Sequence, residues 1–446
     1  MATGIPKKDT SAYNSRVRLA YEGKISENEI IKGDMVQYHR IYSHSSGKKL
    51  YFGDNLDVLR LLAFDSAICG KINLIYIDPP FATQNQFVSR KQSKAYEDIL
   101  TGAAFVEFLR QRLVLLHRLL SNNGSIYLHL DEKMIFEMKL IMDEIFGVSN
   151  YRNMIIRKKC NPKNYTRKAY GNITDFILFY TKSDKYVWNK QTIPLSEDSK
   201  KEYQYIEEKT GRKFMKVPIH APGTRNGETG KPWRGKMPPQ GKHWQYPPKL
   251  LDEMDTRGEI FWSKNGNPRR KVYLDEHQGV GVQDIWLEFR DAHNQNIKIT
   301  GYPTEKNPDL LRRIIAASSN QGDIVLDCFA GSGTTLAIAN EMQRNWIGVD
   351  NSIEALKTIL HRFERGIQPM GDFVKKTSNK NNGQQTLFDS ADDSCLYHYP
   401  NPQHKAITDF SIFIPYKTTS GVIATINDWK IRNIDTDFPH EKKVNK

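Results

Sequence analysis

Short apolar runs alternate with helical patterns in two separate stretches of this 446-residue chain, and this alternation limits the fold more than any other feature. In the first stretch, from Leu50 to about Lys182, the pattern predicts strands at residues 72–77, 125–130 and 176–180 and helices at residues 105–120 and 134–146. The rhythm returns between Thr304 and Arg365, with strands at residues 324–326 and 346–349. Strands that alternate with helices form parallel sheets. We therefore predict an α/β fold in which both stretches share one mostly parallel sheet, with helices on both faces.

The segments outside these stretches divide the chain into five predicted parts. Residues from about 183 to 300 are rich in turn residues and break the alternation, and the chain ends in a polar stretch followed by a short β-leaning tail. The five parts are an N-terminal extension (1–45), a first half of the sheet domain (46–184), an insertion (185–300), a second half (301–371), and a linker with a C-terminal extension (372–446).

The positive charge of the chain is concentrated in one segment. The whole chain has a net charge of +14, and residues 151–250 contain 22 Lys and Arg against 8 Asp and Glu, so the remainder is close to neutral. Aromatic residues are interleaved with these cations, as a surface for phosphates and exposed bases requires. A solvated loop region whose charge only maintains solubility is the alternative. The lack of a long apolar run or apolar leader predicts a cytoplasmic protein without membrane contact, and four scattered cysteines predict no metal site.

A glycine turn follows the predicted strand at residues 324–326. It comprises Phe329, Ala330, Gly331, Ser332, Gly333 and Thr334. Small residues where a strand gives way to a helix let backbone N–H groups approach a ligand closely. A dinucleotide-binding turn would have a third glycine where Leu336 stands, but Asp350 lies at about the spacing expected of a ribose-binding carboxylate. The turn indicates a ribose-bearing ligand, with a merely tight strand-to-helix turn as the alternative.

A second motif, Asp78-Pro79-Pro80-Phe81, follows the predicted strand at residues 72–77. Two consecutive prolines end the strand, fix the backbone and leave carbonyls without competing local donors. A flat base could donate one amino hydrogen to the Asp78 carboxylate and the other to the Pro79 carbonyl, while Phe81 stacks on its ring. For this motif in isolation a structural Pro-Pro turn is the better interpretation. Its combination with the glycine turn favours a binding site.

At these two motifs the sequence resembles the β class of S-adenosylmethionine-dependent DNA amino-methyltransferases, in which the catalytic motif precedes the cofactor motif and a target-recognition region lies between them. The resemblance covers about residues 50–365 and extends to bacterial site-specific methyltransferases and type III modification subunits. It implies a Rossmann-like methyltransferase sheet with circularly permuted motif order. Residues 46–184 would then be the catalytic half, 185–300 the target-recognition region and 301–371 the cofactor-binding half.

The resemblance also implies roles for individual residues. Asp78, Pro79, Pro80 and Phe81 would form the catalytic site. S-adenosylmethionine would be held near its adenine by Asp54, at its methionine portion by Asp327 and the glycine turn, at its carboxylate by Thr304 and Lys306, and at its ribose by Asp350. The sequence departs from the usual family pattern twice: Phe81 replaces the more usual tyrosine, and Asn307 interrupts the commoner Lys-Pro pair after Lys306.

The activity implied by the resemblance is methylation of an exocyclic amino group in double-stranded DNA. A paired base cannot offer that group to such a pocket, so we expect base flipping with Phe81 stacked on the extruded base. By resemblance, aspartate at the first motif position favours adenine N6, with cytosine N4 and RNA methylation as alternatives. A dehydrogenase, a non-catalytic DNA-binding module and a protein methyltransferase each explain fewer of the features. The implied setting is a bacterial restriction-modification system at the nucleoid, and a restriction subunit or a homodimer stays open as a partner.

The insertion and the residues just before it are expected to contact DNA. The candidates for phosphate contact are Arg157, Lys158, Lys159, Arg167 and Lys168. Candidates for base reading or strand insertion lie between Lys231 and Tyr246.

Overall fold

A ten-stranded sheet forms the centre of the computed structural model, which describes residues 17–44, 47–80, 102–160, 168–290, 306–366 and 406–434. In spatial order the strands are β1 (Tyr38–Tyr42), β18 (Ser411–Pro415), β2 (Lys49–Phe52), β17 (Asn345–Asp350), β16 (Ile324–Asp327), β3 (Ile72–Ile77), β4 (Leu120–Leu130), β6 (Thr174–Thr181), β5 (Tyr151–Lys158) and β15 (Ile285–Trp286). All neighbours from β18 to β4 run parallel, and β1 and β6 are antiparallel to theirs. The predicted mostly parallel α/β sheet is confirmed.

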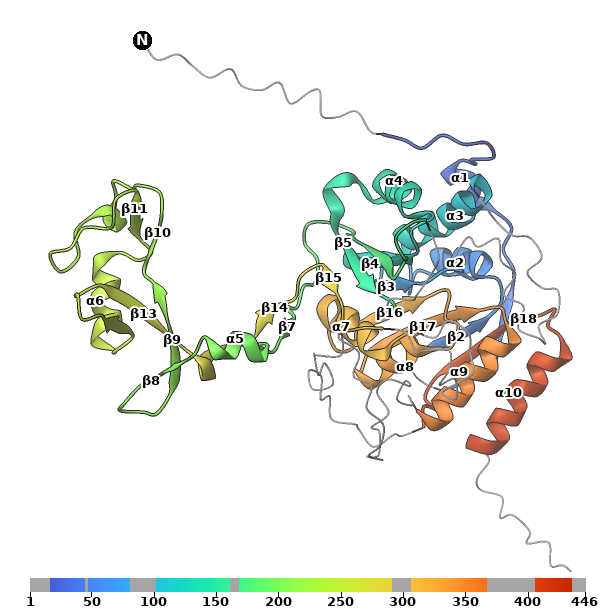
Figure 1. Cartoon of the computed structure of the whole chain (residues 1–446). Helices are drawn as coiled ribbons and strands as arrows, with labels where there is room; N and C mark the ends of the chain where they lie inside the picture. The colour runs from blue at the N-terminus through green and yellow to red at the C-terminus, as the bar shows by residue number, and fades with distance from the viewer. Residues whose placement is uncertain are drawn as a thin grey trace, which may run out of the picture. The chain divides into compact units, whose positions relative to one another are not determined.

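Helices cover both faces of this sheet (Figure 1). On one side lie α1 (Glu27–Lys32), α2 (Asn55–Phe64), α3 (Ala103–Leu119) and α4 (Ile135–Phe146), and on the other α7 (Pro308–Ser318), α8 (Thr334–Glu341), α9 (Ile353–Arg365) and α10 (Ser420–Asn433). On α3, Leu109, Leu113 and Leu116 recur at helical spacing and are fully buried. The apolar residues whose spacing predicts this helix therefore form the face that packs into the core.

The two halves of the sheet meet where β16 pairs with β3. Leu326 lies opposite Ile75 and Val325 opposite Leu74, although the insertion separates them in sequence. Because the two strands are parallel, the motifs that follow them emerge at the same edge of the sheet. The permuted motif order thus yields the same spatial arrangement as an uninterrupted Rossmann-like sheet.

Parts of both predicted extensions belong to the central sheet. β1 comes from the N-terminal segment, and β18 comes from the C-terminal segment and lies between β1 and β2. The rings of Tyr51 and Phe413 stack at 4.7 Å, and Phe410 contacts Tyr42 and Trp429 at 5.4 and 5.3 Å between ring centroids. These aromatic contacts anchor α10 to the sheet.

Residues 192–282 form a separate compact unit, here called the inserted unit. Its elements are β7 (Thr192–Ile193), α5 (Glu197–Lys201), β8 (Tyr205–Ile206), β9 (Lys213–Pro218), β10 (His220–Pro222), β11 (Lys242–Trp244), α6 (Pro248–Thr256), β12 (Ile260–Trp262), β13 (Pro268–Tyr273) and β14 (Val280–Gly281). Four of these strands form a sheet in the order β12-β13-β9-β8. Across the described ranges, no helix combines the length and apolar character needed to cross a membrane.

Candidate active site

Three aspartates lie at the carboxyl ends of neighbouring parallel strands. Asp350 and Asp327 are the last residues of β17 and β16, and Asp78 follows β3 directly. Since β17, β16 and β3 are adjacent and parallel, the three side chains gather at one edge of the sheet. Ligands of open α/β sheets bind at this edge. The structure thus brings together the two motifs that the sequence places far apart.

The Asp78 carboxylate is held on one side only. Its Oδ2 lies 3.1 Å from Nζ of Lys306, and the two side chains are only 18% and 10% exposed. Its Oδ1 is buried and accepts no hydrogen bond from any described residue. Leaving a buried polar atom unpaired costs about 1–3 kcal/mol, so this oxygen is suited to receive a hydrogen from a ligand. Two predicted site residues, Phe81 and Thr304, lie outside the described part of the chain.

Left-handed backbone at two glycines shapes the turn between β16 and α8. Gly331 and Gly333 have φ values of 49° and 73°, a region that glycine enters without strain. A Cβ on Gly333 would also lie 2.8 Å from Cγ1 of Ile359, so the packing of α9 against the turn requires glycine there. The N–H of Gly331 donates to Oδ2 of Asp350 at 2.8 Å. This bond ties the glycine turn to the end of β17.

The rest of the turn is well buried and internally bonded. The hydroxyls of Ser332 and Thr334 lie 3.0 Å apart, and the carbonyl of Ser332 accepts a hydrogen bond from Nε of Arg362 at 2.8 Å. Ala330 is only 6% exposed. The turn is therefore a rigid backbone cradle rather than a loose loop.

Two carboxyl groups at this edge are shifted toward their protonated form. Burial raises the pKa of Asp327 to about 7, and the negative charges of Asp78 and Asp350 add to this effect. Burial likewise raises the pKa of Asp350 to about 6, although the N–H groups of Ser352 and Gly331 donate to it. A positively charged ligand would favour the ionised form of both groups. The edge is therefore electrostatically suited to a cationic ligand.

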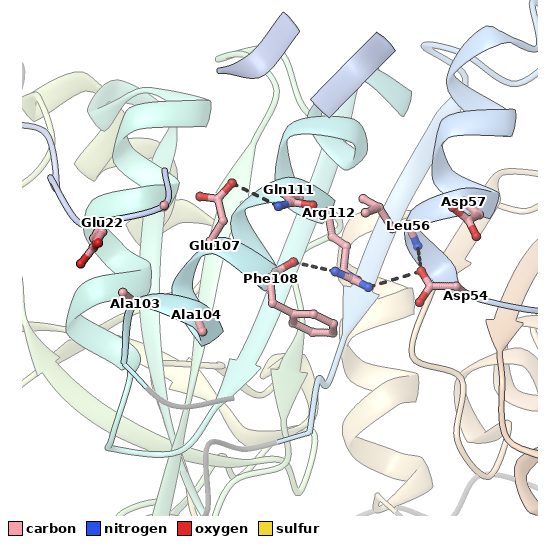
Figure 2. Close-up of a pocket in the computed structure, with 11 residues that line it drawn as sticks. Glu22, Asp54, Leu56, Asp57, Ala103, Ala104, Glu107, Phe108, Gln111 and Arg112 are labelled. Atoms are coloured by element: carbon pink, nitrogen blue, oxygen red, sulfur yellow. Dashed lines mark hydrogen bonds and ion pairs between the residues drawn. The ribbon is translucent and has the colours of Figure 1, made fainter. Parts of the chain in front are cut away.

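Asp54 lines a cavity of about 840 Å³ formed by the starts of α2 and α3 and the segment around Glu22 (Figure 2). Its carboxylate accepts the N–H of Leu56 at 2.7 Å, which caps α2, and lies 3.4 Å from a terminal nitrogen of Arg112. The Arg112 guanidinium in turn lies 3.5 Å from the ring centroid of Phe108. The cavity therefore combines an aromatic wall with a paired carboxylate.

Two contacts connect the surroundings of this cavity with the glycine turn. The rings of Phe108 and Phe329 lie 6.2 Å apart, and Nδ2 of Asn55 donates to the carbonyl of Cys328 at 2.7 Å. Phe108 and Arg112 were missed in the sequence, because an aromatic residue and an arginine inside an amphipathic helix resemble ordinary packing residues. Only the pairing of α3 with the start of α2 gives them a place beside Asp54.

A fully buried polar network lies among β3, β4, β5 and β6 and was also missed. Nδ1 of His129 lies 2.8 Å from the hydroxyl of Tyr76, Nε2 of His129 lies 2.9 Å from Oδ2 of Asp175, and Arg157 lies 2.9 Å from that same oxygen. Burial alone would raise the pKa of Asp175, but His129 and Arg157 hold that pKa well below its usual range. The network fixes the strand ends around Asp78.

The prediction that Arg157 contacts phosphate is wrong. Its side chain is 0% exposed, because its guanidinium binds Asp175 and donates from Nε to the carbonyl of Phe289 at 2.7 Å. Lys158 and Lys159 are partly exposed and Lys168 is exposed, so they stay candidates, and Arg167 lies outside the described residues.

The aromatic residues between Lys231 and Tyr246 are largely core. Trp233 and Trp244 are each 2% exposed and pack edge to face with ring centroids 6.1 Å apart. Their indole N–H groups donate to Asp252 at 2.9 Å and to the carbonyl of Lys231 at 3.0 Å. The expectation that this segment supplies base-reading or inserting residues is therefore wrong for these two tryptophans. A small folded core and a nucleic-acid surface have similar compositions when both mix aromatic and basic residues.

The proteins most similar to this chain include bacterial methyltransferases. The N6_N4_Mtase family, described as DNA methylase, matches residues 72–361. Type II methyltransferase M.EcaI of Enterobacter cloacae is 44% identical over 414 residues, which cover 91% of this chain and 88% of that protein. The Type III restriction-modification enzyme StyLTI Mod subunit of Salmonella typhimurium is 26% identical over 67% of this chain. The match covers about half (51%) of that relative's length. DNA adenine methyltransferase YhdJ of Escherichia coli is 26% identical over 76% of this chain and 90% of that protein.

Proposed function

The chain belongs to the N6_N4_Mtase family of DNA methylases, and from this premise we propose that it methylates N6 of adenine at a specific sequence in double-stranded DNA. S-adenosylmethionine is the methyl donor, as the sequence predicts. The relative named as a restriction-modification Mod subunit supports a role in such a system. The proposal includes action on DNA in the bacterial cytoplasm, with a restriction subunit or a second copy of the chain as partner.

The geometry of Asp78 is the observation that carries this proposal. One carboxylate oxygen is ion-paired with Lys306, and the other is buried without a described donor. The amino nitrogen of adenine is a poor nucleophile because its lone pair is delocalised into the ring. Oδ1 of Asp78 and the carbonyl of Pro79 each accept a hydrogen bond from one N–H of this amino group. These hydrogen bonds localise the lone pair and stabilise the positive charge that grows on nitrogen. Lys306 acts as a positioning residue that fixes which oxygen faces the base.

The remaining parts of the catalytic motif hold the base. The rigid backbone at Pro79 and Pro80 keeps the carbonyl acceptor in place as the methyl group approaches. The adenine leaves the duplex, and Phe81 stacks on its exposed ring. No covalent bond between protein and base is needed for this transfer.

The residues at the sheet edge fit the methyl donor, which supplies a methyl group on a positively charged sulfur. We assign its adenine to the cavity beside Asp54 and its ribose hydroxyls to Asp350. Its methionine portion is assigned to Asp327 and the turn residues Phe329, Ala330, Gly331, Ser332, Gly333 and Thr334, with Thr304 and Lys306 at its carboxylate. The buried Asp327 and Asp350 support this assignment, because a cationic ligand offsets the cost of ionising them.

Adenine is the proposed target because an aspartate begins the catalytic motif, and the relative named as a DNA adenine methyltransferase is consistent with it. Cytosine presents the same kind of amino group, and both bases belong to the chemistry of this family. RNA is the more remote alternative. These alternatives differ in product, so product analysis separates them.

A labelling experiment tests the proposal directly. The protein is incubated with methyl-labelled S-adenosylmethionine and unmethylated bacterial DNA, the DNA is digested, and the labelled nucleosides are identified by mass spectrometry. We expect N6-methyladenine within one sequence context. Label in N4-methylcytosine would replace adenine as the target, and label only in RNA added in parallel would overturn the DNA assignment.

A further inference from the structure

The small sheet of the inserted unit has one face that packs against α6 and a second face that carries partly or fully exposed cations. Phe261 lies opposite Arg269, and Lys271 lies opposite Lys216, across β12, β13 and β9. Directly opposed residues project from the same face of a sheet. The neighbouring Ile260 on β12 projects from the other face and packs into the core with α6 and the tryptophans. We call the surface formed by Tyr205, Lys216, Phe261 and Arg269 the cationic face.

Lys216 holds a fixed place on the cationic face. Its Nζ lies 3.4 Å from the ring centroid of Tyr205 and 3.4 Å from that of Phe261, so two aromatic rings hold the ammonium. Burial and the positive charge of Arg269 lower the pKa of Lys216. Two cations therefore lie near one another, and neither offsets the charge of the other.

Ion pairs hold seven of the fifteen other Lys and Arg of the inserted unit. The unit contains 17 Lys and Arg against 12 Asp and Glu. Lys271 pairs with Glu207 at 2.8 Å and Arg212 pairs with Asp275 at 2.7 Å. Among the described residues, no carboxylate forms an ion pair with Lys216 or Arg269. The cationic face is thus one place where positive charge of the unit has no internal counterion.

The positive potential extends from the cationic face to the adjoining strands β10 and β11. Burial, Lys242 and Arg269 together lower the pKa of His220. Lys242 is exposed and has no ion-pair partner in the described part of the chain. Clustered like charges destabilise a folded surface unless an anion binds to them.

We propose that the cationic face binds backbone phosphates of double-stranded DNA, with Lys216 and Arg269 as the direct contacts. This inference rests on the proposed function and names the surface that holds the substrate. Because the Tyr205 and Phe261 rings already hold the Lys216 ammonium, the face is suited to phosphate contact rather than base stacking. Phosphate contacts supply affinity and position the protein without selecting a sequence.

The test is duplex binding by the double variant Lys216→Ala/Arg269→Ala, measured by fluorescence anisotropy on a labelled duplex of arbitrary sequence at several salt concentrations. Each lost phosphate contact lowers the slope of log K against log salt by about 0.9, so we expect a slope smaller by about 2. Affinity at low salt should fall on the order of tenfold or more. The charge-retaining variant Lys216→Arg/Arg269→Lys should keep most of the affinity.

Lys249→Ala/Arg257→Ala is the control, because it removes two positive charges at α6 and at its C-cap Arg257, and α6 packs on the opposite face of the sheet. This control should bind duplex DNA within about twofold of the unchanged protein, since distant surface charges are screened. Equal weakening by both double variants, or none by the first, would overturn the proposal. The proposal would also be overturned if binding of duplex RNA depended on the cationic face and binding of duplex DNA did not. The measurement needs no turnover, so failure of methyl transfer in the labelling experiment is a separate result.

Discussion

The carboxyl edge of the large sheet and the inserted unit use polar residues in opposite ways. At the sheet edge, Oδ1 of Asp78 is buried without a hydrogen-bond donor among the described residues, and burial raises the pKa of Asp327. In the inserted unit, many carboxylates are ion-paired on the surface, and the tryptophans that suggested a binding role fill a core. Buried polar groups without partners are costly, so their presence points to a ligand. Paired charges and packed rings need no ligand to explain them.

The largest effect that this comparison predicts is at Asp78. Asp78→Asn keeps the shape but removes the charge that stabilises the developing positive charge on the base. We expect methyl transfer to fall at least about 10³-fold, which is roughly 4 kcal/mol in the transition state. Single-turnover rates with labelled cofactor, together with calorimetric cofactor affinity, are the measurements.

Asp184→Asn is the matched control for that change, because Asp184 is exposed and lies outside the site. It should transfer methyl groups at the normal rate. A normal rate for Asp78→Asn as well would remove Asp78 from the catalytic site and with it the contrast between the two regions.

The second prediction concerns the core of the inserted unit. Trp233→Ala removes a side chain that is 2% exposed and leaves a cavity beside Trp244 and Trp262, with ring centroids 6.1 and 5.2 Å away. We expect its free energy of unfolding to fall by about 3 kcal/mol and site-specific methylation to fall with it. Thermal unfolding and limited proteolysis measure the first effect. Cofactor affinity should be unchanged, because none of the proposed cofactor residues lies in this unit.

Trp188→Ala provides the comparison for Trp233→Ala. Trp188 is 52% exposed, so its removal should cost far less stability. If Trp233→Ala were as stable as Trp188→Ala but failed to bind DNA, the base-reading interpretation would return.

The third prediction separates two roles of Lys306. The resemblance assigns Lys306 to the cofactor carboxylate, whereas the structure pairs it with Asp78 at 3.1 Å. If it positions Asp78, Lys306→Met should lower the single-turnover rate about 10- to 100-fold and cofactor affinity by less. Lys306→Arg should restore part of the rate by restoring the charge. A change confined to cofactor affinity would leave Lys306 as a cofactor ligand only.

The sequence predicts the sheet edge well because its motifs are tied to strand ends. The glycines at 331 and 333 and the prolines at 79 and 80 each impose a local backbone that few other residues tolerate. Such constraints are visible without knowing what packs nearby. The parallel order of β17, β16 and β3 then follows from the alternation of strands and helices.

Other features depend on contacts that no local pattern records. Arg157 is buried because β5 and β6 pair so that it lies opposite Asp175, and Trp233 is core because β12 and α6 close over it. The strand β18 joins the sheet through Tyr51 and Phe413, whose pairing spans most of the chain. Composition cannot distinguish these outcomes from exposed binding residues, because burial is decided by tertiary pairing.

The smallest predicted effect is the pH dependence of the sheet edge. Burial raises the pKa of Asp327 to about 7, whereas the unfolded value is near 4. At Asp327 the folded protein therefore keeps a proton that the unfolded chain loses between about pH 4 and 7, and the contribution of this group to stability without cofactor falls as pH rises through that window. A cationic cofactor prefers the ionised form, so the titration of Asp327 alone should raise its affinity roughly eightfold between pH 6 and pH 7.5, with proton release. Calorimetry in buffers of different ionisation enthalpy measures both the cofactor affinity and the number of protons released.

Asp327→Asn should flatten the pH profile of cofactor affinity, whereas Asp54→Asn should keep this profile because the Asp54 side chain is 49% exposed. A pH profile that stays equally steep in Asp327→Asn would place the titrating group elsewhere.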